Sequence, residues 1–246
     1  MTTKSPLAPK KFPKLPQISG ISIAVGSCGI SKKGRKDLML AKLARGTVIA
    51  GVFTKSLAAA APILWCKKAL KSTRARAIVV NSGNANAFTG HIGELAVKKT
   101  VKTTAKIIGC RENHVFISST GVIGEKFNPN LIINKIEKIN SKNKNSLLEG
   151  AKAIMTTDTF PKVSIKNINL DNQSFKIYGI AKGSGMIQPN MGTMLVYIFI
   201  ECEISKQLMI RLLKNNLDNT FNSITVDSDT STSDTLMMFS VGNKNI

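Results

Sequence analysis

Apolar and polar positions alternate along this chain with the two periods of regular secondary structure. Short apolar runs rich in β-branched residues predict strands. Two of these runs flank residues 171–173, which predicts a hairpin. The predicted strands are Thr47–Thr54, Arg76–Asn81, Val115–Ser118, Lys162–Leu170, Ser174–Ala181, Thr193–Ile200 and Thr235–Val241.

Other segments carry apolar residues at helical spacing. Pro62, near the start of Ala58–Leu70, suits the first turn of a helix. Ser205 is a candidate N-cap for a later helix. A polar stretch around Ser141–Asn145 interrupts the helical pattern of Leu131–Ala153. The apolar positions expected to face the core are Val97, Val101, Ala105 and Ile108 in Glu94–Ile108, and Leu208, Leu212 and Leu217 after Ser205.

Helices and strands are intermixed, which predicts an α/β or α+β fold. Many short strands with a hairpin favour mixed sheets over a doubly wound parallel sheet. No GxGxxG or GxxxxGK[ST] pattern occurs, and Gly183-Ser184-Gly185 is only weak support for a phosphate-binding loop. Residues 1–20 carry four of the eight prolines and are expected to form an extended arm.

The chain is strongly basic, with 35 Lys and Arg against 14 Asp and Glu and a net charge of +21. One interpretation is a nucleic-acid-binding protein. The basic residues are spread out and few aromatics interleave with them, which favours a solvated lysine-rich surface instead. A positive field would also attract anionic metabolites.

Several classes of protein are disfavoured by composition. No apolar run reaches the ~18 residues of a membrane span, so we expect no membrane association. The four cysteines include no CxxC pair and are expected to be reduced thiols, and the two histidines are isolated. We therefore expect no metal site.

Candidate chemistry lies in residues 181–195, AKGSGMIQPNMGTML. A threonine hydroxyl needs an adjacent base to act as a nucleophile. Cleavage before Thr193 would supply one, because the freed α-amino group has a reference pKa of about 7.7–8.0. Gly192 lacks a Cβ and tolerates the strained backbone of an N-to-O acyl shift. The alternative is a glycine turn that leads into a buried strand.

Further segments make a resemblance specific. The stretch KGSGM…PNMGTML resembles the cleavage site of the ornithine acetyltransferase (glutamate N-acetyltransferase) family. Other segments similar to that family follow in its order: SPLAPKKFP at 5–13, AGVFT at 50–54, AAP at 60–62, VNSGNANAFTG at 80–90, SSTGVIGE at 118–125, AIMTTDTFPK at 153–162 and VDSDTSTSDT at 226–235. They cover nearly the whole chain.

The resemblance implies a layered α-β-β-α sandwich of the N-terminal-nucleophile type. Self-cleavage between Gly192 and Thr193 would give an α chain, residues 1–192, and a β chain, residues 193–246. Thr193 would be the nucleophile, and Thr120 and Gly121 would form the oxyanion hole. The residues implied to bind substrate are Thr156, Lys182 and Thr193.

The implied reaction is acetyl transfer from N-acetylornithine to glutamate through an acetyl-Thr193 enzyme, in arginine biosynthesis. It needs no metal and no organic cofactor, although some members of the family also accept acetyl-CoA. The resemblance further implies a cytoplasmic enzyme that assembles as an α2β2 heterotetramer and binds neither nucleic acid nor membrane.

The sequence also departs from the family pattern. Gly192 stands where the family usually has Ala, Ser228 and Ser233 stand where Gly and Asn are common, and Phe88 stands where Cys is common. Family chains continue beyond residue 246, so we expect part of the C-terminal half, with an acidic substrate ligand, an Asn and a Thr, to be absent. The alternatives are an inactive truncated remnant, or an amidase or aminopeptidase that uses the same N-terminal nucleophile.

Overall fold

The computed structural model describes residues 5–31, 34–140, 145–170, 173–187, 194–227 and 229–242. Strands and helices alternate along this part of the chain. The strands are β1 (Ile21–Gly26), β2 (Leu38–Leu43), β3 (Val48–Phe53), β4 (Ala77–Asn84), β5 (Val115–Val122), β6 (Lys162–Leu170), β7 (Gln173–Lys182), β8 (Leu195–Ile200) and β9 (Thr235–Ser240). The α-helices are α1 (Ala61–Ala69), α2 (Gly90–Ile108), α3 (Pro129–Asn140), α4 (Leu147–Ala153) and α5 (Lys206–Leu217).

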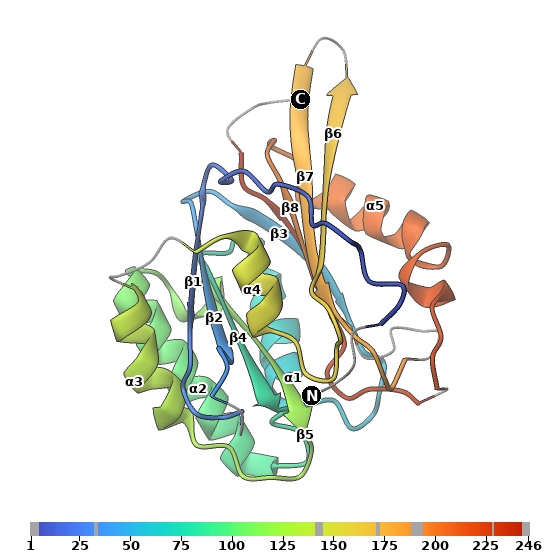
Figure 1. Cartoon of the computed structure of the whole chain (residues 1–246). Coiled ribbons are helices and arrows are strands. Elements are labelled where there is room, and N and C mark those ends of the chain that lie inside the picture. Colours follow the sequence, from blue (N-terminus) through green and yellow to red (C-terminus); the bar gives the residue numbers. More distant parts are fainter. Residues whose placement is uncertain are drawn as a thin grey trace.

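These strands form two mixed sheets (Figure 1). The first sheet has the order β1-β2-β4-β5, with β4 and β5 parallel. The second sheet has the order β3-β9-β8-β7-β6, with β8 and β9 parallel and the other pairs antiparallel. The predicted preference for mixed sheets with a β6–β7 hairpin is confirmed.

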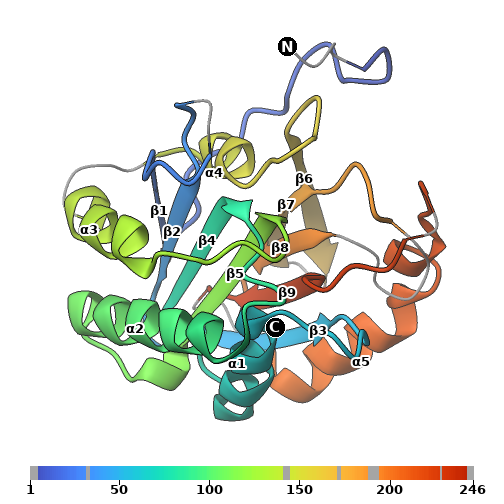
Figure 2. The same cartoon turned by 90° about the horizontal axis from the view of Figure 1, so that it is seen from below.

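The two sheets pack face to face between layers of helices. Helices α2 and α3 cover the outer side of the first sheet, and α5 covers part of the outer side of the second (Figures 1 and 2). This is the α-β-β-α arrangement that the resemblance implied. No helix in the described ranges is long and apolar enough to cross a membrane.

Large aromatic side chains fill the space between the sheets. Tyr178, Tyr197, Phe199 and Phe239 are all fully buried there, and the rings of Phe199 and Phe239 stack with centroids 5.4 Å apart. Such stacking adds about 0.5–1.5 kcal/mol beyond the burial of area. The face of the second sheet that packs on the first is therefore built by residues from both sides of position 193.

Helix α1 covers the edge strand β5 of the first sheet. The indole N–H of Trp65 donates to the carbonyl of Val115 at 2.9 Å, and the thiol of Cys66 donates to the carbonyl of Ile117 at 3.1 Å. An unpaired strand edge exposes backbone N–H and C=O groups, and these two side chains supply hydrogen bonds to two of the carbonyls.

Three sequence predictions need correction. The segments that form β1 and β2 were not predicted as strands. The strand predicted at Val115–Ser118 is longer, and Thr120 and Gly121 lie within it as part of β5, because the parallel pairing with β4 continues to Val122. In α5 the buried residues are Met209 and Leu213.

The error in α5 has a simple cause. Leu208 is 36% exposed and Leu212 is 39% exposed, so the predicted stripe faces largely away from the sheet, while Leu217 is partly buried. The helix carries apolar residues on two adjacent faces, and spacing alone did not select the one that packs on the second sheet. The predicted cap is confirmed, because Ser205 Oγ accepts from the N–H of Leu208 at 3.2 Å.

The topology yields a prediction about the expected cut before Thr193. Strands β3, β6 and β7 precede the cut and β8 and β9 follow it, yet all share one sheet in which β7 pairs with β8 and β3 with β9. The two pieces should therefore coelute in native size-exclusion chromatography and separate only in denaturant. Separation in native buffer would contradict this pairing.

Candidate active site

Lys182 lies at the end of β7 on the face that points toward the first sheet. Successive strand residues point to opposite faces, so Lys182 follows the buried Tyr178 and Ile180 into the space between the sheets. Its side chain is buried, with 3% of the residue exposed. Its Nζ donates to Thr120 Oγ1 at 2.9 Å and to Thr156 Oγ1 at 3.0 Å. Three of the predicted site residues therefore meet at one point.

The direction of these bonds has a chemical consequence. A hydroxyl is one donor and two acceptors, whereas an ammonium group only donates. Because Thr120 and Thr156 both accept from Lys182, each keeps its own proton for a different acceptor. The cluster therefore presents two O–H donors that are held in place by one ammonium group.

The charge on Lys182 is balanced by nearby groups. Burial lowers the pKa of the Lys182 ammonium, and the neighbouring Lys162 and Arg35 act in the same direction. The carboxyl groups of Asp158 and Asp234 oppose this lowering of the pKa. A buried lysine next to carboxyl groups is typical of a functional site.

Asp158 holds the loop between α4 and β6 against the end of β7. Its Oδ1 accepts from Lys162 Nζ at 2.6 Å and from the N–H of Gly183 at 2.8 Å, and its Oδ2 accepts from the N–H of Thr156 at 3.2 Å. Burial alone would raise the pKa of Asp158, but the hydrogen bonds from Gly183 and Lys162 and the charges of Lys162 and Lys182 hold it below its usual value. Asp158 lies inside the motif at 153–162, but nothing in the sequence alone marks it as a site residue.

Arg35 fixes the same loop from the other side. Its guanidinium donates to the carbonyl oxygens of Met155 and Thr156, the latter at 3.2 Å. The backbone of Thr156 is therefore held by Asp158 at its N–H and by Arg35 at its carbonyl. This fixes the position from which the Thr156 hydroxyl reaches Lys182.

Gly121 allows β4 and β5 to approach closely beside Thr120. Its φ is +135°, and a Cβ at this position would lie 2.2 Å from the carbonyl carbon of Gly83. Gly83 itself has a φ of +110° and pairs with Gly121 in the register of the two strands. No other residue type fits here without displacing a strand.

Gly192 and Thr193 lie outside the described residues, but the next residue, Met194, is placed. The N–H of Met194 donates to Asp234 Oδ1 at 2.8 Å. Leu195 pairs with Lys182 across β7 and β8. Met194 and Leu195, the first two residues after position 193, therefore lead into β8 opposite Lys182. Lys182 in turn is hydrogen-bonded to Thr120.

Asp234 is a buried carboxyl next to this point. Burial raises its pKa to about 8, against the hydrogen bonds from Met194 and Ser231 and the charge of Lys182, which lower it. Asp234 is fully buried, and its Oδ2 has no hydrogen-bond partner among the residues that the structure describes. It lies in the motif at 226–235 and was not singled out from the sequence.

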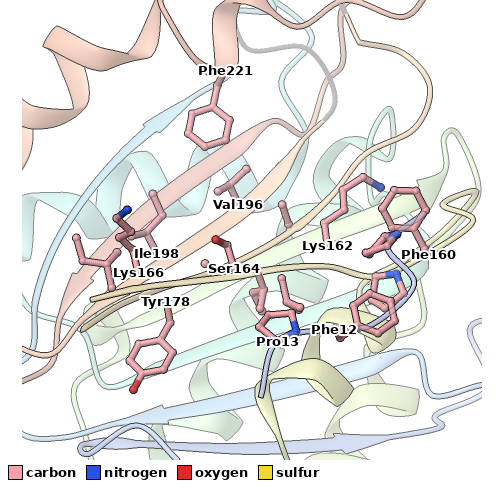
Figure 3. Close-up of a pocket in the computed structure, with 17 residues that line it drawn as sticks. Phe12, Pro13, Phe160, Lys162, Ser164, Lys166, Tyr178, Val196, Ile198 and Phe221 are labelled. Carbon is pink, nitrogen blue, oxygen red and sulfur yellow. The ribbon is translucent and has the colours of Figure 1, made fainter. Parts of the chain in front are cut away.

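One apolar hollow lies elsewhere, against the second sheet. It has a volume of about 510 Å³ and runs along β6, β7 and β8, where Phe12 and Pro13 of the N-terminal arm face Phe160 and Lys162 (Figure 3). Ala181 lines it, and Ala181 and Lys182 point to opposite faces of β7. The hollow is therefore not the space in which Lys182 meets the two threonines. Among the described residues, no three His, Cys, Asp or Glu side chains are grouped to hold a metal.

Comparison with known proteins agrees with the resemblance. The sequence profile of the ArgJ family matches residues 22–245. The chain belongs to the ArgJ family. It is 47% identical over 239 residues to the arginine biosynthesis bifunctional protein ArgJ of Bradyrhizobium diazoefficiens, covering 97% of this chain and 58% of that protein. The chain thus spans a little under three fifths of the length of the curated relatives that it matches.

Solved structures agree with this fold. The ornithine acetyltransferase of Mycobacterium tuberculosis, in complex with ornithine, has a TM-score of 0.61 and 28% identity, covering 72% of this chain and 94% of that chain. The L-aminopeptidase D-Ala-esterase/amidase of Ochrobactrum anthropi, described as a variant of the Ntn hydrolase fold, has a TM-score of 0.53 at 10% identity, covering 92% and 73%. The second likeness concerns the fold alone.

The raised pKa of Asp234 predicts a pH-dependent stability. Between pH about 4 and about 8 the folded carboxyl keeps a proton that the unfolded one releases, so folding is destabilised as pH rises. The free energy of unfolding should fall by at most about 1.4 kcal/mol per pH unit in this range. Asp234→Asn removes this titration.

Urea unfolding from pH 5 to pH 8 checks this prediction, with Thr193→Ala as the background so that all samples stay uncut. The Asn variant should gain stability relative to its Asp234 parent as pH rises. If the two proteins differ in their free energy of unfolding by the same amount at every pH in this range, Asp234 is ionised in the folded protein.

Proposed function

We propose that this chain cuts itself between Gly192 and Thr193 and that Thr193 then carries an acetyl group between two amino acids. The observation that supports it is the Lys182–Thr120–Thr156 cluster, which lies where the chain leaves position 193. The family and its members' printed role in arginine biosynthesis support the same reaction.

Self-cleavage would begin with the hydroxyl of Thr193. Its Oγ attacks the carbonyl carbon of Gly192, the C–N bond breaks, and the hydroxyl proton ends on the released amine. The result is an ester that water hydrolyses to the carboxylate of Gly192 and the free Thr193 hydroxyl. The new α-amino group then stands beside that hydroxyl as a base.

Acetyl transfer would use the same atoms. Thr193 Oγ attacks the acetyl carbon of N-acetylornithine, the amide C–N bond breaks, and the amine of ornithine takes the proton. The amine of glutamate next attacks the acetyl ester, which gives N-acetylglutamate and restores the hydroxyl. Ornithine bound in the related Mycobacterium tuberculosis structure supports this substrate class.

Thr120 and Gly121 would stabilise the oxyanion formed in each attack. The Thr120 hydroxyl keeps its proton because it accepts from Lys182. The backbone N–H of Gly121 is the second donor in this proposal. Removal of one such donor elsewhere costs about 2.7–4 kcal/mol in the transition state.

Lys182 and Thr156 would bind the amino-acid substrates. The Lys182 ammonium would hold a carboxylate, and the Thr156 hydroxyl would donate to it or to the acetyl oxygen.

No metal or organic cofactor takes part in these steps, and acetyl-CoA as an alternative acetyl donor belongs to the same proposal. The assembly we propose is the α2β2 heterotetramer, in the cytoplasm.

Self-cleavage tests the first step on this chain alone. The uncut chain has a mass of 26.5 kDa, and a cut before Thr193 gives pieces of 192 and 54 residues. Thr193→Ala should abolish the cut, and Thr193→Ser should retain it, because serine keeps the hydroxyl. Intact-mass spectrometry in denaturant reads all three proteins, and a cut in the Ala variant would exclude this mechanism.

Acetyl transfer tests the second step. It is measured on this chain and on the chain extended by the C-terminal part of a relative, with N-acetylornithine and glutamate. In whichever form is active, Lys182→Met should lower kcat/KM about 100-fold or more, because it removes the cation and the bonds that orient two hydroxyls. Lys166→Met, on the exposed side of β6, is the matched control and should leave the rate unchanged.

The outcomes separate the alternatives. Activity in the extended chain alone identifies this chain as a remnant that lacks essential residues. Amide hydrolysis without transfer to glutamate identifies a hydrolase. A Lys182→Met variant as active as the Lys166→Met control would exclude Lys182 from substrate binding.

A further inference from the structure

Both neighbours of residues 188–193 are held by one later segment of the chain, residues 225–235. On the N-terminal side, the carboxylate of Asp227 accepts two backbone N–H bonds, from Met186 to Oδ2 at 2.7 Å and from Ile187 to Oδ1 at 2.9 Å. The N–H of Val226 donates to the carbonyl of Ile187 at 2.8 Å. Ile187 is therefore bound at both of its backbone polar groups.

The C-terminal neighbour is held in the same way. The N–H of Met194 donates to Asp234 Oδ1 at 2.8 Å, and the carbonyl of Met194 accepts from the N–H of Thr235 at 2.9 Å. Each end thus has one aspartate that accepts the N–H and one backbone N–H that donates to the carbonyl. The two aspartates are seven positions apart in one motif.

The segment that holds these ends is itself fixed. The N–H of Thr54, at the end of β3, donates to the carbonyl of Asp234 at 3.0 Å, and the Thr54 hydroxyl donates to the carbonyl of Ser231 at 2.8 Å. The N–H of Ala60, just before α1, donates to the carbonyl of Thr232 at 2.9 Å. Residues 231–235 are buried throughout. The support for the Met194 end is therefore a rigid part of the fold.

Such a frame matters for an attack within the chain. An intramolecular acyl shift depends on near-attack geometry, and a displacement of about 1 Å can cost 100-fold in rate. Fixing both ends of a short segment reduces the number of conformations open to the residues between them. The bonds at Ile187 and Met194 supply this restriction on either side of the expected cut.

We propose that Asp227 and Asp234 are positioning residues for self-cleavage, because they hold the two ends of the segment that contains Gly192 and Thr193. This rests on the proposed function. Neither residue supplies an atom to the reaction. They act through the backbone of Met186, Ile187 and Met194.

The two aspartates use their carboxyl oxygens differently. Asp234 accepts the Met194 bond with one oxygen, and asparagine has one amide oxygen of similar position. Asp227 uses both oxygens for two N–H donors, and asparagine would offer one acceptor and one clashing NH2 group. Asparagine should therefore replace Asp234 and fail to replace Asp227.

Cleavage rates of the full chain test this asymmetry. Each protein is made by cell-free translation with a short labelled pulse, and the uncut fraction is followed by denaturing electrophoresis. Asp234→Ala should slow the cut about tenfold or more, and Asp234→Asn should stay within about threefold of the unsubstituted chain. Asp227→Ala and Asp227→Asn should both slow it about fivefold or more.

The controls separate positioning from folding. Asp229→Ala removes an exposed carboxylate from the same segment and should cleave at the normal rate. The thermal midpoint of each Asp variant, measured on the Thr193→Ala background, shows whether the fold is intact. Exchange of the Met194 amide hydrogen on that background should be faster in Asp234→Ala and unchanged in Asp234→Asn.

Several results would overturn the proposal. If Asp227→Ala or Asp234→Ala cleaves at the normal rate, that residue does not position the cut, while self-cleavage itself is still supported. An Asp234→Asn variant as slow as Asp234→Ala would show that the carboxyl does more than accept one bond. If the unsubstituted chain remains uncut, the proposed function fails, and the positioning role fails with it.

Discussion

The ammonium group of Lys182 is the contact on which the candidate active site depends. It joins Thr120 at the end of β5 in the first sheet to Thr156 in the loop before β6. A buried cation is costly unless it is paired and hydrogen-bonded, and the ionised carboxylate of Asp158 provides an opposing charge. Removal of any of these partners leaves a charge or a polar group without a hydrogen bond or counter-charge between the sheets. We therefore expect substitutions of these residues to affect one another.

The sheet topology explains why the cluster can lie beside an expected cleavage point. Strands β7 and β8 are antiparallel neighbours, and Leu195 pairs with Lys182 at their shared end. Strand β9 runs parallel to β8 and begins at Thr235, directly after Asp234. Leu195, at the start of β8, therefore lies between Lys182 of β7 and Thr235 of β9. A cut there would leave the sheet intact, since its strands are held by hydrogen bonds across the cut.

Much of this fold could be predicted from spacing, and the exceptions have physical reasons. The hairpin strands, predicted as Lys162–Leu170 and Ser174–Ala181, flank a clear turn signal and were predicted within a residue at each end. Ser119-Thr120-Gly121 looks like a loop because it is polar, but β4 carries the equally polar Asn81-Ser82-Gly83 opposite it and the pairing continues. The site threonines and Lys182 were found through motifs. Asp234 and Arg35 were missed because they bind backbone groups of residues far away in the sequence, which no local pattern reveals. Asp158 was missed because its bond to the N–H of Gly183, which joins its loop to the end of β7, is equally distant in the sequence.

The most direct test of the account is the location of the acetyl group. The active form of the chain is mixed with N-acetylornithine that carries an isotopically labelled acetyl group, quenched in acid before glutamate is added, and mapped by peptide mass spectrometry. We expect the label on the hydroxyl oxygen of Thr193, in the peptide that begins at this residue, and we expect the label to be lost when glutamate is supplied. Label on any other residue, or transfer to glutamate with no labelled enzyme, would contradict this expectation.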